Sequence, residues 1–103
     1  MSKYGNKKIV IDGYKFDSLA EGRRYGKLKI LELRGDISKL EIHPRFDLHV
    51  NSKKICAYVA DFQYIESGIK IVEDVKGVKT AVYRIKNKMM MAEYGIKILE
   101  TDA

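Results

Sequence analysis

The sequence predicts a mixed α/β (α+β) domain in which helices pack on a β-sheet. Two segments, 18–34 and 80–94, have the apolar spacing and the capping residues of helices. Runs of alternating or β-branched residues flank and separate these segments, and such runs are typical of strands. The length of 103 residues fits one domain that spans residues 1–103.

A hairpin is the first predicted element. Asp12-Gly13 separates the short apolar runs 8–11 and 14–16, and this dipeptide favours a tight two-residue turn between paired strands. We therefore expect the chain to begin with two short antiparallel strands.

A helix is predicted to follow the hairpin. Ser18 and Glu21 have the spacing of a capping box, which marks a helix start, and Gly35 predicts its end just after Arg34. The residues expected to face the core are Leu19 or Ala20, Leu28 and Leu31.

The middle of the chain is predicted to be strands. The expected strands are 37–42, 46–50, a long extended run 55–65, and 69–75, with a last short strand at 96–99. His43-Pro44 interrupts the first two, and Ser67-Gly68 is expected to be a hairpin turn.

The second predicted helix begins after Thr80 and ends at about Tyr94, before Gly95. Its apolar residues at helical spacing are Val82, Ile85, Met89 and Ala92. We expect this stripe to face the core.

Composition narrows the class of protein. The net charge of +6 favours polyanionic partners, nucleic acid first. The single cysteine, Cys56, cannot form an internal disulfide and is interpreted as a small buried hydrophobe. The sequence has no apolar run near the roughly 20 residues that span a bilayer and no signal-peptide core, so we expect a cytoplasmic protein without membrane partners.

The segment 61–76 contains the residues with the clearest chemistry. If Ser67-Gly68 forms the centre of the turn, Asp61 lies opposite Asp74, and strand alternation places both on one face with Lys76. Two opposed carboxylates repel each other unless a positive charge lies between them. The segment therefore favours a site for a divalent cation with oxygen ligands, beside a fixed ammonium group.

Two alternatives stay open for this segment. The three residues could form an ordinary cross-strand ion pair, and a register slip of one residue would scatter them. With such a slip Glu73 would replace Asp74 as the ligand. In the favoured register Glu73 points to the other face, among Tyr58, Ala60, Phe62, Tyr64, Ile71 and Val75. A lysine or arginine from a packed helix is its expected partner there.

The order Asp61, hairpin, Asp74-Val75-Lys76 resembles the motif that names the PD-(D/E)XK nuclease superfamily, with Ala60 where the family often has proline. Glu21 is similar to the helical acidic residue of several branches. The stretch from about residue 13 to 100 resembles small phage-encoded nucleases of the Holliday-junction-resolvase type. The phrases that match are Phe16-Asp17-Ser18, Leu40-Glu41-Ile42-His43-Pro44, Ala60-Asp61-Phe62 and Glu73-Asp74-Val75-Lys76-Gly77.

The resemblance implies a restriction-endonuclease-like core, αβββαβ, a mixed sheet flanked by helices and preceded here by the hairpin. It implies a DNA endonuclease in which Glu21, Asp61, Asp74 and the Val75 carbonyl bind Mg²⁺ or Mn²⁺ and Lys76 positions the attacking water. Glu21 also has a purely structural interpretation as the partner in its capping box, and one rotamer is not expected to serve both roles.

The resemblance further implies branched DNA as the substrate, and a phage protein that acts in a bacterial host during recombination or replication. A homodimer is expected because resolving a junction takes two paired cuts. Two other functions stay open: a non-catalytic DNA-binding protein with the nuclease fold, and a sequence-specific nicking or restriction-type nuclease.

Basic residues near the site are candidates for contacting DNA phosphates. They are Arg23, Arg24, Lys79, Arg84, Lys86 and Lys88. A solvated basic face is an equally good interpretation of the four on the second helix and its approach. His43 is interpreted as a structural histidine or as a group near the metal ligands or substrate, and His49 has no identifiable partner.

Overall fold

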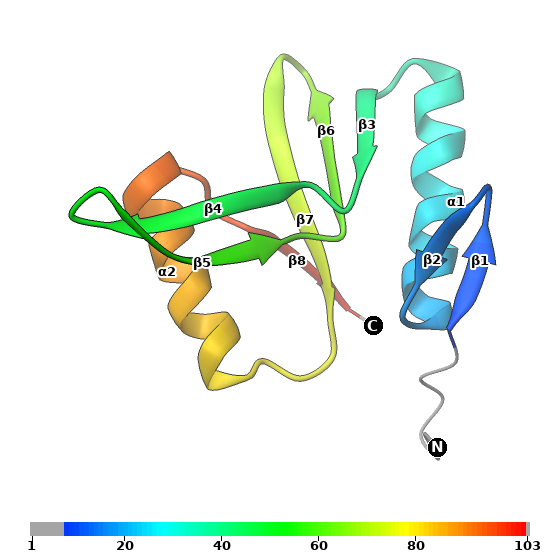
Figure 1. The fold of residues 1–103 in the computed structure, drawn as a ribbon. Helices are drawn as coiled ribbons and strands as arrows, with labels where there is room; N and C mark the ends of the chain where they lie inside the picture. The colour runs from blue at the N-terminus through cyan, green and yellow to red at the C-terminus, as the bar shows by residue number, and fades with distance from the viewer. Residues whose placement is uncertain (1–7, 103) are drawn as a thin grey trace.

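The computed structural model describes residues 8–102, which form two helices and eight strands (Figure 1). The elements are β1 (Ile9–Ile11), β2 (Tyr14–Phe16), α1 (Leu19–Arg34), β3 (Ser38–Ile42), β4 (Arg45–Val50), β5 (Lys53–Val59), β6 (Phe62–Glu66), β7 (Ile69–Lys76), α2 (Ala81–Tyr94) and β8 (Leu99–Asp102). The predicted mixed α and β composition and the N-terminal hairpin are confirmed.

The main sheet has four strands in the order β3-β6-β7-β8. β3, β6 and β7 are antiparallel neighbours, and β8 runs parallel to β7 after the crossover through α2. Helix α1 and this sheet with α2 therefore follow the predicted order αβββαβ. The β4–β5 hairpin is a separate two-stranded sheet within the connection from β3 to β6, and it projects away from the main sheet (Figure 1).

The β6–β7 hairpin has the predicted register. Phe62 pairs with Glu73 and Ile65 pairs with Lys70, around a turn at Ser67-Gly68 whose two residues both have positive φ angles. Glycine tolerates this conformation without steric cost. The register prediction, on which the placement of the acidic residues depends, is thus confirmed.

Strand β7 separates two hydrophobic clusters. One cluster joins β4, β5 and α2 to the sheet and includes Leu48, Tyr58, Ala60, Val72, Tyr83 and Met90. The other joins α1 and the β1–β2 hairpin to the opposite face and includes Phe16, Tyr25, Leu28, Phe62, Tyr64 and Val75. Successive side chains of a strand point to opposite faces, so β7 contributes to both cores and positions side chains toward both helices.

The caps of α1 occur where the sequence predicts them. Ser18 accepts a hydrogen bond from the Glu21 backbone N–H, and Gly35 ends the helix in the left-handed conformation. The buried residues of α1 are Gly22, Tyr25 and Leu28, so only Leu28 of the predicted stripe is fully buried. A Cβ atom at Gly22 would lie 3.2 Å from side-chain atoms of Ile9 and Ile11. The absent side chain lets the β1–β2 hairpin pack tightly on α1.

The predicted extended run 55–65 is not one strand. The chain leaves β5 at Val59 and enters β6 at Phe62, and these strands belong to different sheets. As a result, Tyr58 and Ala60 pack in the α2 cluster with Val72, on the face opposite to the predicted one. Phe62, Tyr64, Ile71 and Val75 do lie on the predicted face.

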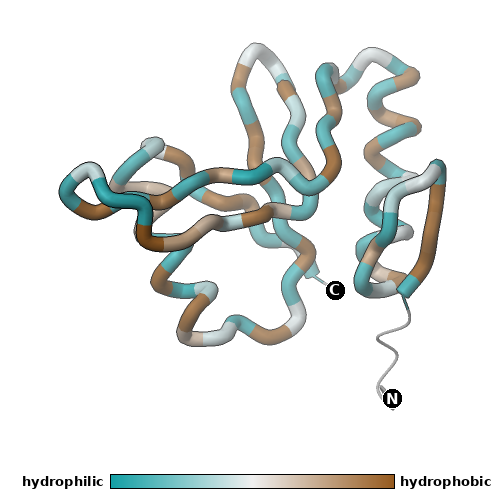
Figure 2. Tube along the Cα trace, viewed as in Figure 1, coloured by the Kyte–Doolittle hydropathy of each residue, from teal (hydrophilic) through white to brown (hydrophobic). Residues whose placement is uncertain are grey.

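Of the predicted buried stripe of α2, only Met89 packs against the core, and it is partly buried. Val82 and Ile85 are about 60% exposed, at 61% and 59%, whereas Tyr83 and Met90 are buried. The helix has apolar residues on two stripes, and the stripe that contains Tyr83 faces the sheet. Figure 2 shows hydrophobic residues interspersed with hydrophilic ones along this helix and the β4–β5 hairpin. No helix within residues 8–102 has the length and apolar character needed to cross a membrane.

Candidate active site

The break between β5 and β6 places Asp61 beside β7. The Asp61 backbone N–H donates to Asp74 Oδ1 at 2.9 Å, and the Val75 N–H donates to Asp61 Oδ2 at 2.7 Å. The Asp74 carboxylate therefore bonds to the backbone of Asp61 itself, and the Asp61 carboxylate bonds to the backbone of Val75, the residue after Asp74. The N–H groups of a strand point along the plane of its sheet, so the Asp61 carboxylate lies at the edge of β7, in that plane.

This position corrects one detail of the predicted geometry. Asp61 precedes β6, so strand alternation does not govern its side chain, which accepts a hydrogen bond from the Val75 N–H at the edge of β7 instead of projecting from a face of the sheet. In a strand the carbonyl of a residue points to the same edge as its N–H. The Val75 carbonyl is thus directed to the edge that Asp61 occupies, in keeping with its predicted place among the ligands.

Asp74 lies on the α2 face and is 2% exposed. Its carboxylate accepts a hydrogen bond from the Tyr58 hydroxyl and lies 3.8 Å from Lys76 Nζ. Burial raises the pKa of Asp74 to about 6, against the opposing effects of the Lys76 charge and the Asp61 amide. Lys76 is held in turn over the ring of Tyr83, with its Nζ 4.2 Å from the ring centroid.

Glu21 lies in the first turn of α1 and faces Asp61. Its Oε2 accepts a hydrogen bond from Ser18 Oγ at 3.3 Å, while its backbone N–H donates to the same hydroxyl at 3.2 Å. Burial, followed by the negative charges of Asp61 and Asp17, raises the pKa of Glu21 to about 7. One conformation of Glu21 therefore contacts the Ser18 hydroxyl and lies near Asp61. Whether one rotamer can serve both the capping box and a metal ion stays a prediction.

Three side chains bring metal-binding atoms together at this point. Ligand atoms of Glu21, His43 and Asp61 all lie within 4.8 Å of one another. Opposite ligands of an octahedral Mg²⁺ ion are about 4.2 Å apart, so small side-chain shifts would let these three atoms share one cation. Within the described part of the chain, this group includes two of the three predicted carboxylates and excludes Asp74. The donor set of two carboxylates and an imidazole fits a divalent metal ion.

A cavity adjoins this cluster. It has a volume of about 480 Å³. Its lining residues are Lys8, Asp17, Ser18, Glu21, Val75, Gly77 and Val78. The cavity thus lies between Glu21 of the cluster and the backbone that follows β7. Lys8, which was not among the predicted site residues, adds a positive charge to its lining.

Glu73 points away from Asp74, toward α1, where it is fully buried. Arg24 donates to both of its carboxylate oxygens, and the Tyr64 hydroxyl donates to one of them at 2.7 Å. The expected partner from a packed helix is confirmed. Two donors of its guanidinium are engaged in this pair, so Arg24 has a structural role. Its assignment to DNA phosphates stays a prediction.

The remaining basic candidates differ in whether their side chains already have a partner. Lys79 pairs with Glu100 at 2.8 Å, and Lys86 donates to the Ala57 carbonyl at 2.8 Å. Arg23, Arg84 and Lys88 are exposed. These three are therefore the best candidates for contacting a polyanion.

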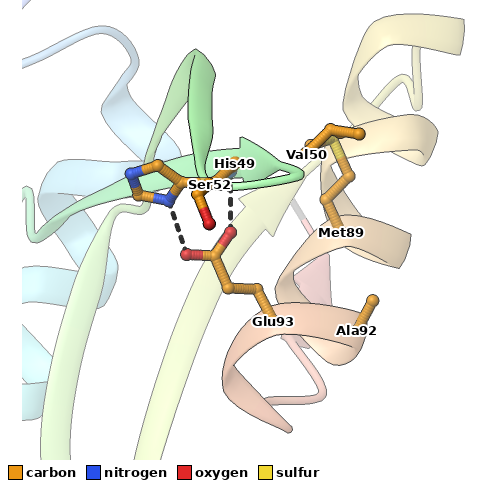
Figure 3. Close-up of a pocket in the computed structure, with 6 residues that line it drawn as sticks. All are labelled: His49, Val50, Ser52, Met89, Ala92 and Glu93. Carbon is orange, nitrogen blue, oxygen red and sulfur yellow. Dashed lines mark hydrogen bonds and ion pairs between the residues drawn. The ribbon is translucent and has the colours of Figure 1, made fainter.

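His49 has the partner that the sequence did not reveal. Its backbone N–H and its Nδ1 each lie 2.7 Å from a carboxylate oxygen of Glu93 on α2 (Figure 3). The pair lines a cavity of about 520 Å³ with Val50, Ser52, Met89 and Ala92. It ties the tip of the β4–β5 hairpin to α2, away from the acidic cluster.

Comparison with known proteins gives one result. No curated protein and no solved structure significantly matches the chain. A family model described as "Protein of unknown function (DUF1064)" matches residues 1–100. The protein therefore belongs to the DUF1064 family.

Proposed function

We propose that the protein is a metal-dependent DNA endonuclease. The observation that supports this most directly is the group formed by Glu21, His43 and Asp61, whose ligand atoms come from three separate parts of the chain and lie within 4.8 Å of one another. Asp74 and Lys76 adjoin the group through the hydrogen bond between Asp61 and Asp74. The net charge of +6 suits a polyanionic substrate.

In the proposed reaction a water oxygen forms a bond to phosphorus and the bond from phosphorus to the leaving oxygen breaks. The water loses one proton, and the leaving oxygen gains one. A bound Mg²⁺ or Mn²⁺ ion would supply Lewis-acid chemistry toward the water and the phosphate. Glu21, Asp61 and the Val75 carbonyl would hold that ion at the edge of β7.

Lys76 has the position to orient the attacking water or to offset charge on the phosphate. Its ammonium group lies between a buried carboxylate and an aromatic ring, which restricts its motion without removing its charge. Asp74 would join the ligands only after its carboxylate leaves the Tyr58 hydroxyl. Its bond to the Asp61 amide keeps it next to the cluster.

The test uses labelled four-way-junction and linear duplex DNA with either Mg²⁺ or EDTA. We expect cleavage by the wild type with Mg²⁺ alone, and its loss in Asp61→Asn and Asp74→Asn while DNA binding survives. Asp36→Asn is the matched control, since this exposed aspartate pairs with Arg34 on the surface. Binding without cleavage by the wild type would instead identify a non-catalytic DNA-binding protein.

Branched DNA is the proposed substrate class, and a homodimer is the proposed assembly because two paired cuts need two sites. The exposed α2 residues Val82 and Ile85, with Met89 and Ala92, have the alternating spacing of three and four that suits a helix–helix seam. Equal cutting of linear and branched DNA would contradict the substrate. A monomeric mass at working concentration, by light scattering, would contradict the assembly.

A further inference from the structure

The corner between β3 and β4 is fixed against the break between β5 and β6. The His43 backbone N–H donates to the Asp61 carbonyl at 3.0 Å, and the Ala60 N–H donates to the Pro44 carbonyl at 3.0 Å. His43 has a φ angle of +56°, in the left-handed region. Histidine is one of the few side chains enriched there, and the following proline restricts the backbone further. His43 is therefore held at a defined position beside Asp61.

The imidazole of His43 packs against Phe16, with ring centroids 5.8 Å apart. This contact with the hydrophobic core leaves the ring edge toward Glu21 and Asp61, where one ring nitrogen belongs to the group of ligand atoms within 4.8 Å. Within residues 8–102 no hydrogen bond or ion pair occupies that imidazole, whereas the His49 imidazole pairs with Glu93. Of the two histidines in the sequence, His49 thus has a side-chain partner among the described residues and His43 has none.

We propose that His43 is a nitrogen ligand of the metal and that it gives the site a preference for Mn²⁺ and related transition ions over Mg²⁺. The inference rests on the proposed function, because it takes the same metal site. Mg²⁺ strongly favours oxygen ligands and dehydrates reluctantly. Imidazole nitrogen suits first-row transition ions, and their affinity for such a site rises from Mn²⁺ through Co²⁺ and Ni²⁺.

The position of His43 also favours an imidazole over a further carboxylate at this point. Glu21 and Asp61 already place two negative charges together, and a third carboxylate would add repulsion in the metal-free protein. A neutral imidazole adds a ligand atom without adding charge. The tilted contact with Phe16 then orients the ring before any ion binds.

The first test measures Mn²⁺ and Mg²⁺ affinities by calorimetric titration of metal-stripped protein. His43→Asn is the variant of choice, since asparagine tolerates the left-handed backbone and replaces the nitrogen ligand with an amide. We expect Mn²⁺ affinity to fall by about 10- to 100-fold, the range found when even outer-shell partners of metal ligands are removed. Mg²⁺ affinity should change little, so the preference for Mn²⁺ falls. His49→Asn is the matched control and should leave both affinities unchanged.

The second test uses the wild type alone and so does not depend on a variant that folds. Imidazole nitrogen and proton NMR signals are followed while substoichiometric Mn²⁺ is added. Selective broadening of the His43 signals, with those of His49 preserved, supports the proposal. Broadening of neither histidine, of His49 alone, or of both to the same degree would overturn it, as would an unchanged Mn²⁺ preference in folded His43→Asn.

The outcomes separate this inference from the proposed nuclease function. Metal binding is measured without DNA, whereas cleavage is measured on junction and duplex substrates. Cleavage that depends on Asp61 but is accompanied by no His43 signature would refute only the ligand assignment. A His43 signature in a protein that cuts neither substrate would refute only the nuclease function.

Discussion

Arg24 on α1 donates hydrogen bonds of 2.6 and 2.9 Å to the carboxylate of Glu73, which is fully buried in β7. The pair connects the helix that bears Glu21 to the strand that bears Asp74. A bidentate arginine–carboxylate contact fixes both distance and orientation. The relative position of Glu21 and Asp74 therefore depends on the Arg24–Glu73 ion pair, although neither predicted ligand belongs to that pair.

We expect Arg24→Met to destabilise the protein by about 3–5 kcal/mol, because it leaves the Glu73 carboxylate buried without its charge partner. Chemical denaturation followed by circular dichroism measures the change. Arg23→Met, at the exposed neighbouring position, should alter stability by less than about 0.5 kcal/mol. A small effect at Arg24 would mean that the pair is not important for stability.

Tyr58→Phe tests the state of Asp74. Removal of the hydroxyl takes a donor from a buried carboxylate and should reduce the free energy of unfolding by about 1–3 kcal/mol. If Asp74 leaves Tyr58 to bind the metal, the same change removes a competitor and should increase Mn²⁺ affinity. Calorimetric titration gives the affinity, and weaker binding in the folded variant would show that Tyr58 supports the site instead.

Metal binding should release protons. The raised pKa values of Glu21, about 7, and Asp74, about 6, mean that the folded protein binds protons more tightly than the unfolded chain. Their stabilising contribution is fully present below about pH 4 and is lost as pH rises through 6 and 7. The metal-free protein should therefore lose stability over this window, whereas the thermal shift on adding Mn²⁺ should be larger at pH 8 than at pH 5.5.

Titration calorimetry in buffers of different ionisation enthalpy counts the released protons. Glu21→Gln should lower the count near pH 6.5, because the amide has no proton to lose. An identical count in the wild type and this variant would show that Glu21 does not titrate with metal binding.

Arg84→Ala combined with Lys88→Ala should weaken DNA binding and reduce its salt dependence. Each lost phosphate contact lowers the slope of log affinity against log salt by about 0.9 for duplex DNA. Fluorescence anisotropy at several salt concentrations measures that slope. Arg34→Ala is the control, because this exposed residue pairs with Asp36 at the far end of α1. Equal slopes for the three proteins would exclude the α2 face from the DNA interface.

Local signals in the sequence predicted much of the fold correctly. The Ser18 and Thr80 caps, the Gly35 and Gly95 ends and the Ser67-Gly68 turn depend on backbone chemistry within a few residues. The opposed segments around Asp61 and Asp74 followed from that turn, because a hairpin's register is set by its loop.

The errors arose where distant parts of the chain decide the outcome. Nothing in the run Val59-Ala60-Asp61-Phe62 signals a turn, and the break there reflects the pairing of β5 with β4. Tyr83 is buried in the cluster that joins α2 to the sheet, and its hydroxyl donates to Glu100 on β8; helical spacing cannot reveal either contact. His43 reaches Glu21 and Asp61 only through the fold, so the sequence offered just its proximity to Pro44 as a signal.

Two backbone hydrogen bonds close the base of the β4–β5 hairpin and fix its root independently of its outer turn. Because His43-Pro44 and Ala60-Asp61 are joined directly to each other, the hairpin's outer end at Asn51-Ser52 can be lengthened, shortened or exchanged without shifting the residues at its root. Changes in the reach of the outer turn can thus accumulate while the residues at the root stay in place.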